Sequence, residues 1–201
     1  MNKVSNAIGR LGVTRLAVGV SVLALAAVVV HAAVIPTILG VGNIPASEMF
    51  QGGPSRFTAR HLITTPGDVG DWHSHPGYVF NVVVHGEIIV EDGCGGIETY
   101  GVGSAFEVMD GRVHRAINNG VEDAVEYNMF VNPAGTPLTV FTGPAGNRPR
   151  RCGPPKNVEE CKDGGWTMFD YPQVFANQGA CIEYVRHRPK VLLTVPEVAP
   201  F

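Results

Sequence analysis

The chain has 201 residues, of which 45% are hydrophobic, and a formal net charge of −3. This length allows one domain with a sizeable core and short extensions, because domains usually take roughly 100–200 residues. Lys3, Arg10 and Arg15 are the only charged residues among the first 32, so the rest of the chain carries 12 basic against 18 acidic residues, a net charge of −6. This acidic balance argues against a nucleic-acid partner.

Residues 1–40 begin with a basic, polar stretch and continue with an uninterrupted apolar run over residues 16–30. This pattern predicts a targeting segment whose basic end stays in the cytoplasm. Two interpretations stay open. A signal peptide would be cleaved near Ala32, which would make the protein secreted or periplasmic. A transmembrane anchor would continue through the apolar sequence to Gly40, which is long enough to cross a bilayer core of about 30 Å, and would hold the domain outside the cytoplasm.

We expect a linker at residues 41–56, where Gly and Pro are frequent, followed by a barrel of short strands over residues 57–133. The 25 Gly and 15 Pro, together with only 16% charged residues, favour turns and short strands over long helices. Apolar or alternating runs predict six strands, at 57–65, 78–84, 87–91, 104–109, 114–118 and 124–131. The last run has a polar face, which would suit a ligand cavity if it faced inward and solvent if it faced outward. The predicted fold class is therefore all-β, a barrel or sandwich.

Residues 134–201 form a predicted C-terminal extension packed on the barrel, in which 166–175 and 182–195 would add a short helix and one or two strands. Four cysteines, at 94, 152, 161 and 181, predict two disulfides, since an exported chain meets oxidising conditions and the number is even. The short, Pro-containing segment between them favours pairing of Cys152 with Cys161, which leaves Cys94 for Cys181. A zinc site is the alternative, although no CxxC spacing is present.

His73 and His75 stand two residues apart in a β-prone run, so an extended chain turns both imidazoles to the same face. A third histidine, His114, follows another glycine-bounded strand. One metal ion could therefore meet three imidazoles, and the sequence predicts His73, His75 and His114 as its ligands.

The stretch that carries these histidines resembles the two motifs of the cupin superfamily. The first motif, Gly, His-x-His, Glu and Gly, matches Gly67, His73, His75 and Gly86, with Val79 in place of the Glu. The second motif, Gly, Pro-x-Gly, His and Asn, is matched in spacing by Gly103, Met109, Gly111, His114 and Asn118, with Met109 in place of the Pro. The resemblance implies a double-stranded β-helix, or jelly-roll, barrel over about residues 57–133.

The same resemblance implies a mononuclear divalent metal inside the barrel, with Fe(II) favoured and Mn, Zn, Ni or Cu as alternatives. Since Val79 cannot bind a metal, the chain is similar to the three-histidine cupins, some of which are oxygenases. Strand parity makes Asn81 and Glu126 candidates for supporting polar groups, whereas His61 and His85 lack the motif spacing. Two functions stay open: a metal-dependent oxygenase acting on a small molecule, and a non-catalytic module that binds a small ligand at the cell surface. The resemblance to cupins also implies that two copies of this chain pair into a homodimer.

Overall fold

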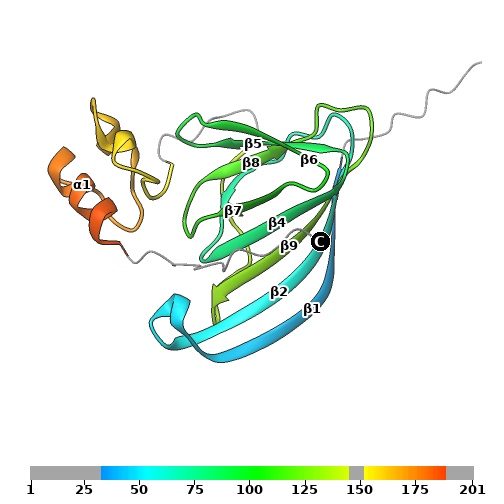
Figure 1. The fold of residues 1–201 in the computed structure, drawn as a ribbon, viewed down its shortest axis with the longest axis horizontal. Coiled ribbons are helices and arrows are strands. Elements are labelled where there is room, and N and C mark those ends of the chain that lie inside the picture. The colour runs from blue at the N-terminus through cyan, green and yellow to red at the C-terminus, as the bar shows by residue number, and fades with distance from the viewer. Residues whose placement is uncertain (1–32, 145–151, 189–201) are drawn as a thin grey trace, which may run out of the picture. The chain divides into compact units, whose positions relative to one another are not determined.

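The computed structural model describes residues 33–144 and 152–188. In this part of the chain, ten strands form two antiparallel sheets of five strands each (Figure 1). The first sheet has the order β1 (Val34–Ser47), β2 (Gly53–Thr64), β9 (Ala124–Pro133), β4 (Tyr78–His85) and β7 (Ala105–Val108). The second has the order β10 (Val140–Gly143), β3 (Trp72–Ser74), β8 (His114–Ile117), β5 (Glu87–Asp92) and β6 (Ile97–Gly101). The all-β jelly-roll prediction is confirmed.

Alternation along the central strands decides which side chains face the space between the sheets. On β9, Glu126, Asn128 and Phe130 are buried, whereas Tyr127 between them is exposed. The polar face of this strand therefore points inward. Gly86, between β4 and β5, has a φ of +66°, and a Cβ there would lie 2.4 Å from the Asp123 carbonyl oxygen, so this turn requires glycine.

The expected linker at residues 41–56 is wrong, because these residues contribute to β1, to the 3₁₀ turn η1 (Glu48–Phe50) and to the start of β2. β1 lies at the edge of its sheet and bonds only to β2 among the described strands. An edge strand tolerates the prolines and glycines that suggested a linker, since only one of its sides needs to bond. Residues 34–40 of the proposed membrane anchor also belong to this strand.

The rest of the targeting segment, residues 1–32, lies outside the described residues, and its two interpretations stay predictions. Within the described ranges, no helix combines the length and the apolar character needed to cross a bilayer.

The C-terminal extension contains η2 (Glu159–Cys161), η3 (Gly165–Met168) and the helix α1 (Gln178–His187). The strand expected from residue 182 is wrong as far as residue 187, and the remainder of that range is described only at Arg188. The Asn177 side chain accepts a hydrogen bond from the Ala180 amide, and this cap starts the helix α1. The sequence also did not predict the short strands β6 and β10.

All four cysteines form disulfides, as predicted, but the favoured pairing was wrong. The bonds join Cys94 to Cys152 and Cys161 to Cys181. The Gly93 amide donates to the Val113 carbonyl, and the Val113 amide donates to that of Cys152, so Cys152 is brought beside the turn that carries Cys94. These long-range hydrogen bonds decide which cysteines lie close together, so the pairing does not follow their separation in the sequence.

Candidate metal centre

Three histidines from neighbouring strands of the second sheet converge, as the motif spacing predicted. His73 on β3 pairs in register with His114 on β8, and His75 follows the end of β3. One ring nitrogen from each histidine lies within 4.8 Å of the other two. The ring centroids are 4.4 Å apart for His73 and His114, and 5.1 Å apart for His75 and His114. This spacing allows all three imidazoles to meet one ion.

Backbone carbonyl groups fix the tautomer of each ring. Nδ1 of His73 lies 2.8 Å from the Asp71 carbonyl oxygen. Nδ1 of His75 lies 2.8 Å from that of Leu138, and Nδ1 of His114 lies 3.1 Å from that of Arg112. A carbonyl oxygen only accepts, so each Nδ1 carries the proton, and a neutral ring then has its lone pair on Nε2. Ligating histidines are commonly oriented in this way.

Burial also keeps these rings neutral. It lowers the pKa of His75 to about 3, with a further contribution from His73, and it lowers the pKa of His114 well below its usual value. The pKa of His73 is lowered too, mainly by burial. Neutral imidazole is the form that binds metal, so the cluster is ready for ligation at neutral pH.

The position of the missing carboxylate is occupied by Val79, which is 2% exposed and lines the same cavity as the histidines. In the described part of the chain, the group of side chains placed to hold an ion consists of the three histidines alone. The donor set is therefore three neutral nitrogens, which suits several divalent transition metals.

The cavity in front of the histidines has a volume of about 410 Å³. Its opposite wall is a row of polar side chains across the first sheet, where Arg60 pairs with Asn128 and Asn128 with Asn81. Arg60 Nε donates to Asn128 Oδ1 at 2.9 Å, and Asn128 Nδ2 donates to Asn81 Oδ1 at 2.8 Å. The three histidines and this polar row thus border the same cavity.

Residues 60–131, a little over a third of the chain, match the family described as the cupin domain. The chain carries a cupin domain. The three histidines, Val79 and the polar row all fall within the matched range.

Similarity to solved structures is at the level of the fold. A double-stranded β-helix protein from Klebsiella pneumoniae is 20% identical, with a TM-score of 0.43 over 54% of this chain and 84% of that one. A cupin domain from Bordetella pertussis is 20% identical, with a TM-score of 0.38 over 49% and 93%. A DMSP lyase from Ruegeria pomeroyi is 18% identical, with a TM-score of 0.41 over 45% of each chain. No curated protein matches the sequence.

Arg60 is the cavity residue of this cupin domain that sequence reasoning missed. Its guanidinium carbon lies 4.6 Å from the centre of the Phe130 ring, and its Nε bonds to Asn128. Among the described residues, its two terminal nitrogens form no hydrogen bond. Burial lowers its pKa to about 10, so it remains charged at neutral pH. Strand parity could have found it, because Arg60 lies two residues from Leu62, which is also directed inward.

Glu126 and Asn81, which parity did suggest, both line the cavity. Glu126 is 3% exposed and accepts no hydrogen bond from the described residues. Burial raises its pKa to about 7, against the opposing effect of Arg60. Near neutral pH, this carboxyl group can therefore either hold or release a proton.

The two other histidines considered lie away from the cluster. The His61 ring packs beside Tyr127, with 5.3 Å between centroids, and Tyr127 is on the outer face of β9. His85 is exposed and its Nδ1 donates to the Asp123 carbonyl. Neither belongs to the group that could hold an ion.

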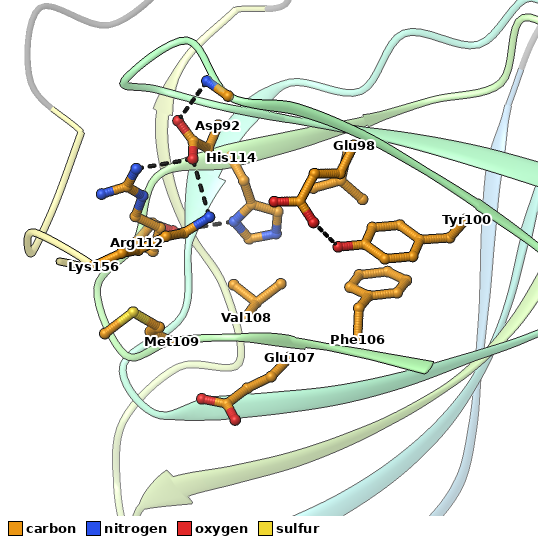
Figure 2. A pocket seen from close by; sticks show the side chains of 12 residues that line it. Asp92, Glu98, Tyr100, Phe106, Glu107, Val108, Met109, Arg112, His114 and Lys156 are labelled. Atoms are coloured by element: carbon orange, nitrogen blue, oxygen red, sulfur yellow. Dashed lines mark hydrogen bonds and ion pairs between the residues drawn. The ribbon is translucent and has the colours of Figure 1, made fainter. Parts of the chain in front are cut away.

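A second cavity of about 310 Å³ lies on another side of His114 (Figure 2). In it, Asp92 meets Arg112 and Lys156 at 2.8 and 3.1 Å, and the Tyr100 hydroxyl donates to Glu98. His114, Phe106 and Val108 border both cavities. His114 thus lies between the cavity lined by the three histidines and a charged network.

Proposed function

We propose that His73, His75 and His114 bind one divalent metal ion, with Fe(II) favoured, and that the protein is a mononuclear metal-dependent oxygenase acting on a small molecule. The observation that carries this proposal is the convergence of three neutral imidazoles, each with its Nδ1 bonded to a carbonyl, on a cavity with polar groups opposite. A divalent ion held by three nitrogens keeps open coordination positions and, if redox-active, supplies electrons for reaction with O₂.

The charge of the cavity favours an anionic substrate. Val79 provides no negative charge and the three histidines are neutral, so a divalent ion would add two positive charges beside that of Arg60. Asp68, Asp71 and Glu126 line the same cavity and offset only part of this charge, because Glu126 is partly protonated near neutral pH. His75 lies 5.2 Å from the Phe130 ring and Arg60 lies 4.6 Å from the same ring. The end of the Arg60 guanidinium, which bonds to none of the described residues, presents paired donors of the kind that bind a carboxylate. One small carboxylate-containing molecule could therefore reach both the histidine cluster and Arg60.

Glu126 would exchange a proton with the bound molecule. A group works best in general acid–base chemistry when its pKa lies near the working pH, and burial brings that of Glu126 to about 7. Arg60 stays close enough to favour the carboxylate form partly. Asn81 and Asn128 would keep Arg60 in place through their hydrogen bonds.

The site would work outside the cytoplasm, either on a membrane-anchored domain or in a secreted or periplasmic protein. The basic and apolar N-terminal sequence supports export, and the pairing of all four cysteines agrees with an oxidising compartment. Within the described chain, the long edge strand β1 exposes Ile35, Leu39 and Val41, which is compatible with the predicted homodimer.

The second candidate is a non-catalytic module that binds a small ligand. Val79 favours it, because without a carboxylate ligand the site lacks one of the groups that would hold a hard metal ion during turnover.

Metal analysis and oxygen consumption together separate the two candidates. The full-length protein, produced with its disulfides, should contain close to one metal per chain, and His114→Ala should lose it while His61→Ala keeps it. With Fe(II) loaded, a panel of small carboxylic acids should include at least one that drives O₂ uptake in the wild type. Ligand binding without O₂ uptake would support the binding module, and a wild type that retains no metal would refute the metal site and with it the oxygenase.

A further inference from the structure

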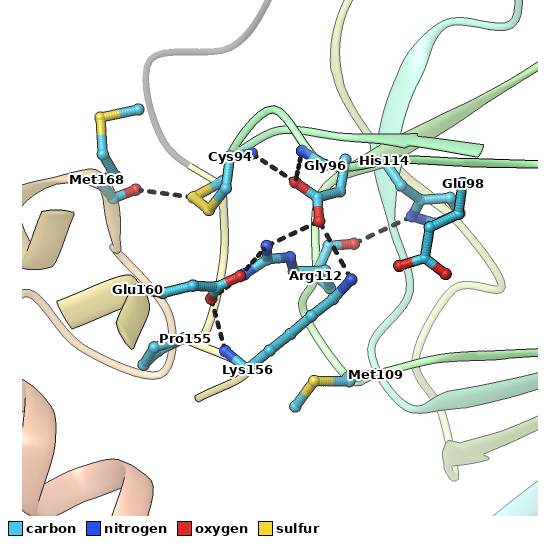
Figure 3. Close-up of polar contacts among 12 residues, drawn as sticks. Cys94, Gly96, Glu98, Met109, Arg112, His114, Pro155, Lys156, Glu160 and Met168 are labelled. Atoms are coloured by element: carbon cyan, nitrogen blue, oxygen red, sulfur yellow. Dashed lines mark hydrogen bonds and ion pairs between the residues drawn. A yellow bond between two sulfur atoms is a disulfide. The ribbon is translucent and has the colours of Figure 1, made fainter. Parts of the chain in front are cut away.

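The residues just before His114 are bonded to the C-terminal extension (Figure 3). Cys152 is bonded covalently to Cys94, and its carbonyl accepts a hydrogen bond from the Val113 amide at 3.2 Å. The Val113 carbonyl in turn accepts from the Gly93 amide at 2.8 Å. A Cβ on Gly153 would lie 2.1 Å from the Gly111 carbonyl oxygen, which shows how closely the two backbones approach.

Arg112 is the centre of this contact. It is 2% exposed, and its guanidinium donates to both carboxylate oxygens of Glu160, at 3.0 and 2.9 Å. It also donates to the Pro154 carbonyl and to Asp92, both at 2.8 Å. Glu160 is tied further to the extension by the Lys156 amide at 2.7 Å. The side chain of Arg112 therefore has little freedom to move.

The backbone of Arg112 connects this network to the three histidines. Its carbonyl oxygen lies 3.1 Å from Nδ1 of His114, the contact that fixes the tautomer and direction of that ring. The corresponding carbonyl groups for His73 and His75 belong to Asp71 and Leu138, which lie outside residues 152–160. Of the three histidines, His114 alone is thus oriented through a residue that residues 152–160 hold in place.

We propose that residues 152–160 of the extension are part of the support of the metal centre, and that Arg112 is a positioning residue through which they hold His114. This inference rests on the proposed three-histidine metal site. Partners that orient a metal-bound histidine typically contribute 10- to 100-fold to metal affinity, so loosening this contact should weaken metal binding by roughly that factor.

Two neighbouring glutamates provide a matched test. Glu160 bonds to the buried Arg112, whereas Glu159 bonds to the exposed Lys162. In the full-length, disulfide-bonded protein, Glu160→Gln should weaken Co(II) and Zn(II) binding about 10- to 100-fold and alter the visible absorption of bound Co(II). Glu159→Gln should leave both unchanged. The Co(II) spectrum reports the ligand geometry directly, which a loss of stability alone would not change.

The two disulfides provide a second, independent test. Replacing Cys94 and Cys152 by Ala removes the bond that joins the extension to the barrel, whereas replacing Cys161 and Cys181 removes a bond inside the extension. The first double variant should bind Co(II) more weakly, with an altered spectrum, and the second should bind it as the wild type does. Thermal unfolding of each variant shows that it is folded at the temperature of the measurement.

The outcomes separate this inference from the proposed function. A wild-type protein that binds no metal would refute the metal site itself. If the wild type binds metal, unchanged affinity and spectrum in Glu160→Gln, or equal losses in the two disulfide variants, would overturn the positioning role alone.

Discussion

Replacing Glu126 by Gln should stabilise the metal-free protein in a strongly pH-dependent way. Glu126 is 3% exposed and accepts no hydrogen bond from the described residues, so its charged form is desolvated without compensation by a donor. Gln has nearly the same shape but no charge. The substitution therefore removes the cost of burying an ionised carboxylate while it keeps the packing.

The magnitude follows from the shift in pKa. The carboxyl group titrates near 4.5 in an unfolded chain and at about 7 in the folded protein. Between these values the folded state binds more protons than the unfolded state, so stability falls as the pH rises through this window. One pKa unit corresponds to about 1.4 kcal/mol, so the full cost, reached above pH 7, is about 3 kcal/mol, and at pH 5 it is under about 1 kcal/mol.

Urea denaturation of the chelator-treated, disulfide-intact protein at pH 5 and pH 8 measures this difference. Glu126→Gln should raise the free energy of unfolding by about 3 kcal/mol at pH 8 and by much less at pH 5. Glu87→Gln, at an exposed position on β5, serves as the control and should have little effect at either pH. An equal rise in the free energy of unfolding at both pH values, or a fall at pH 8, would refute the reasoning. Either result would mean that ionisation of Glu126 does not destabilise the folded protein.

The remaining predictions concern the metal centre. Ala in place of His73, His75 or His114 should lower the metal content sharply, as measured by elemental analysis, and full occupancy in His114→Ala would show that the site is misplaced. Val79→Glu should tighten the binding of a hard ion such as Mn(II), measured by calorimetry, since Val79 is buried and faces the cavity; an unchanged affinity would contradict that orientation. Burial lowers the pKa of His75 to about 3, so the unfolded chain takes up protons below about pH 6.5 that the folded protein excludes. The metal-free Glu126→Gln protein, in which the opposing titration of Glu126 is removed, should therefore lose up to about 1.4 kcal/mol per pH unit through His75, and further stability through His114, as the pH falls below 6.5. A Tm of this variant that stays constant from pH 7 to pH 5 would exclude the linkage.

Local sequence patterns determined the strands and the centre of the site. Side chains two residues apart in a strand share a face, so the His-x-His spacing was enough to bring His73 and His75 together. Glycines at fixed distances marked turns such as the one at Gly86, where φ is positive. These features depend only on the backbone geometry of a few consecutive residues, which a sequence displays directly.

Tertiary structure decided the features that depend on residues far apart in the chain. The inward direction of Glu126 and Asn128 was open until the opposite sheet was in place to bury them. The disulfide partner of Cys94 depended on hydrogen bonds that carry Cys152 to its turn, and the support of His114 by Glu160 depended on a segment 46 residues later in the chain. The edge position of β1 likewise allowed a strand where Gly and Pro had suggested a linker. Each of these outcomes follows from packing between segments that are distant in the chain, and no short stretch of sequence determines the energy of such packing.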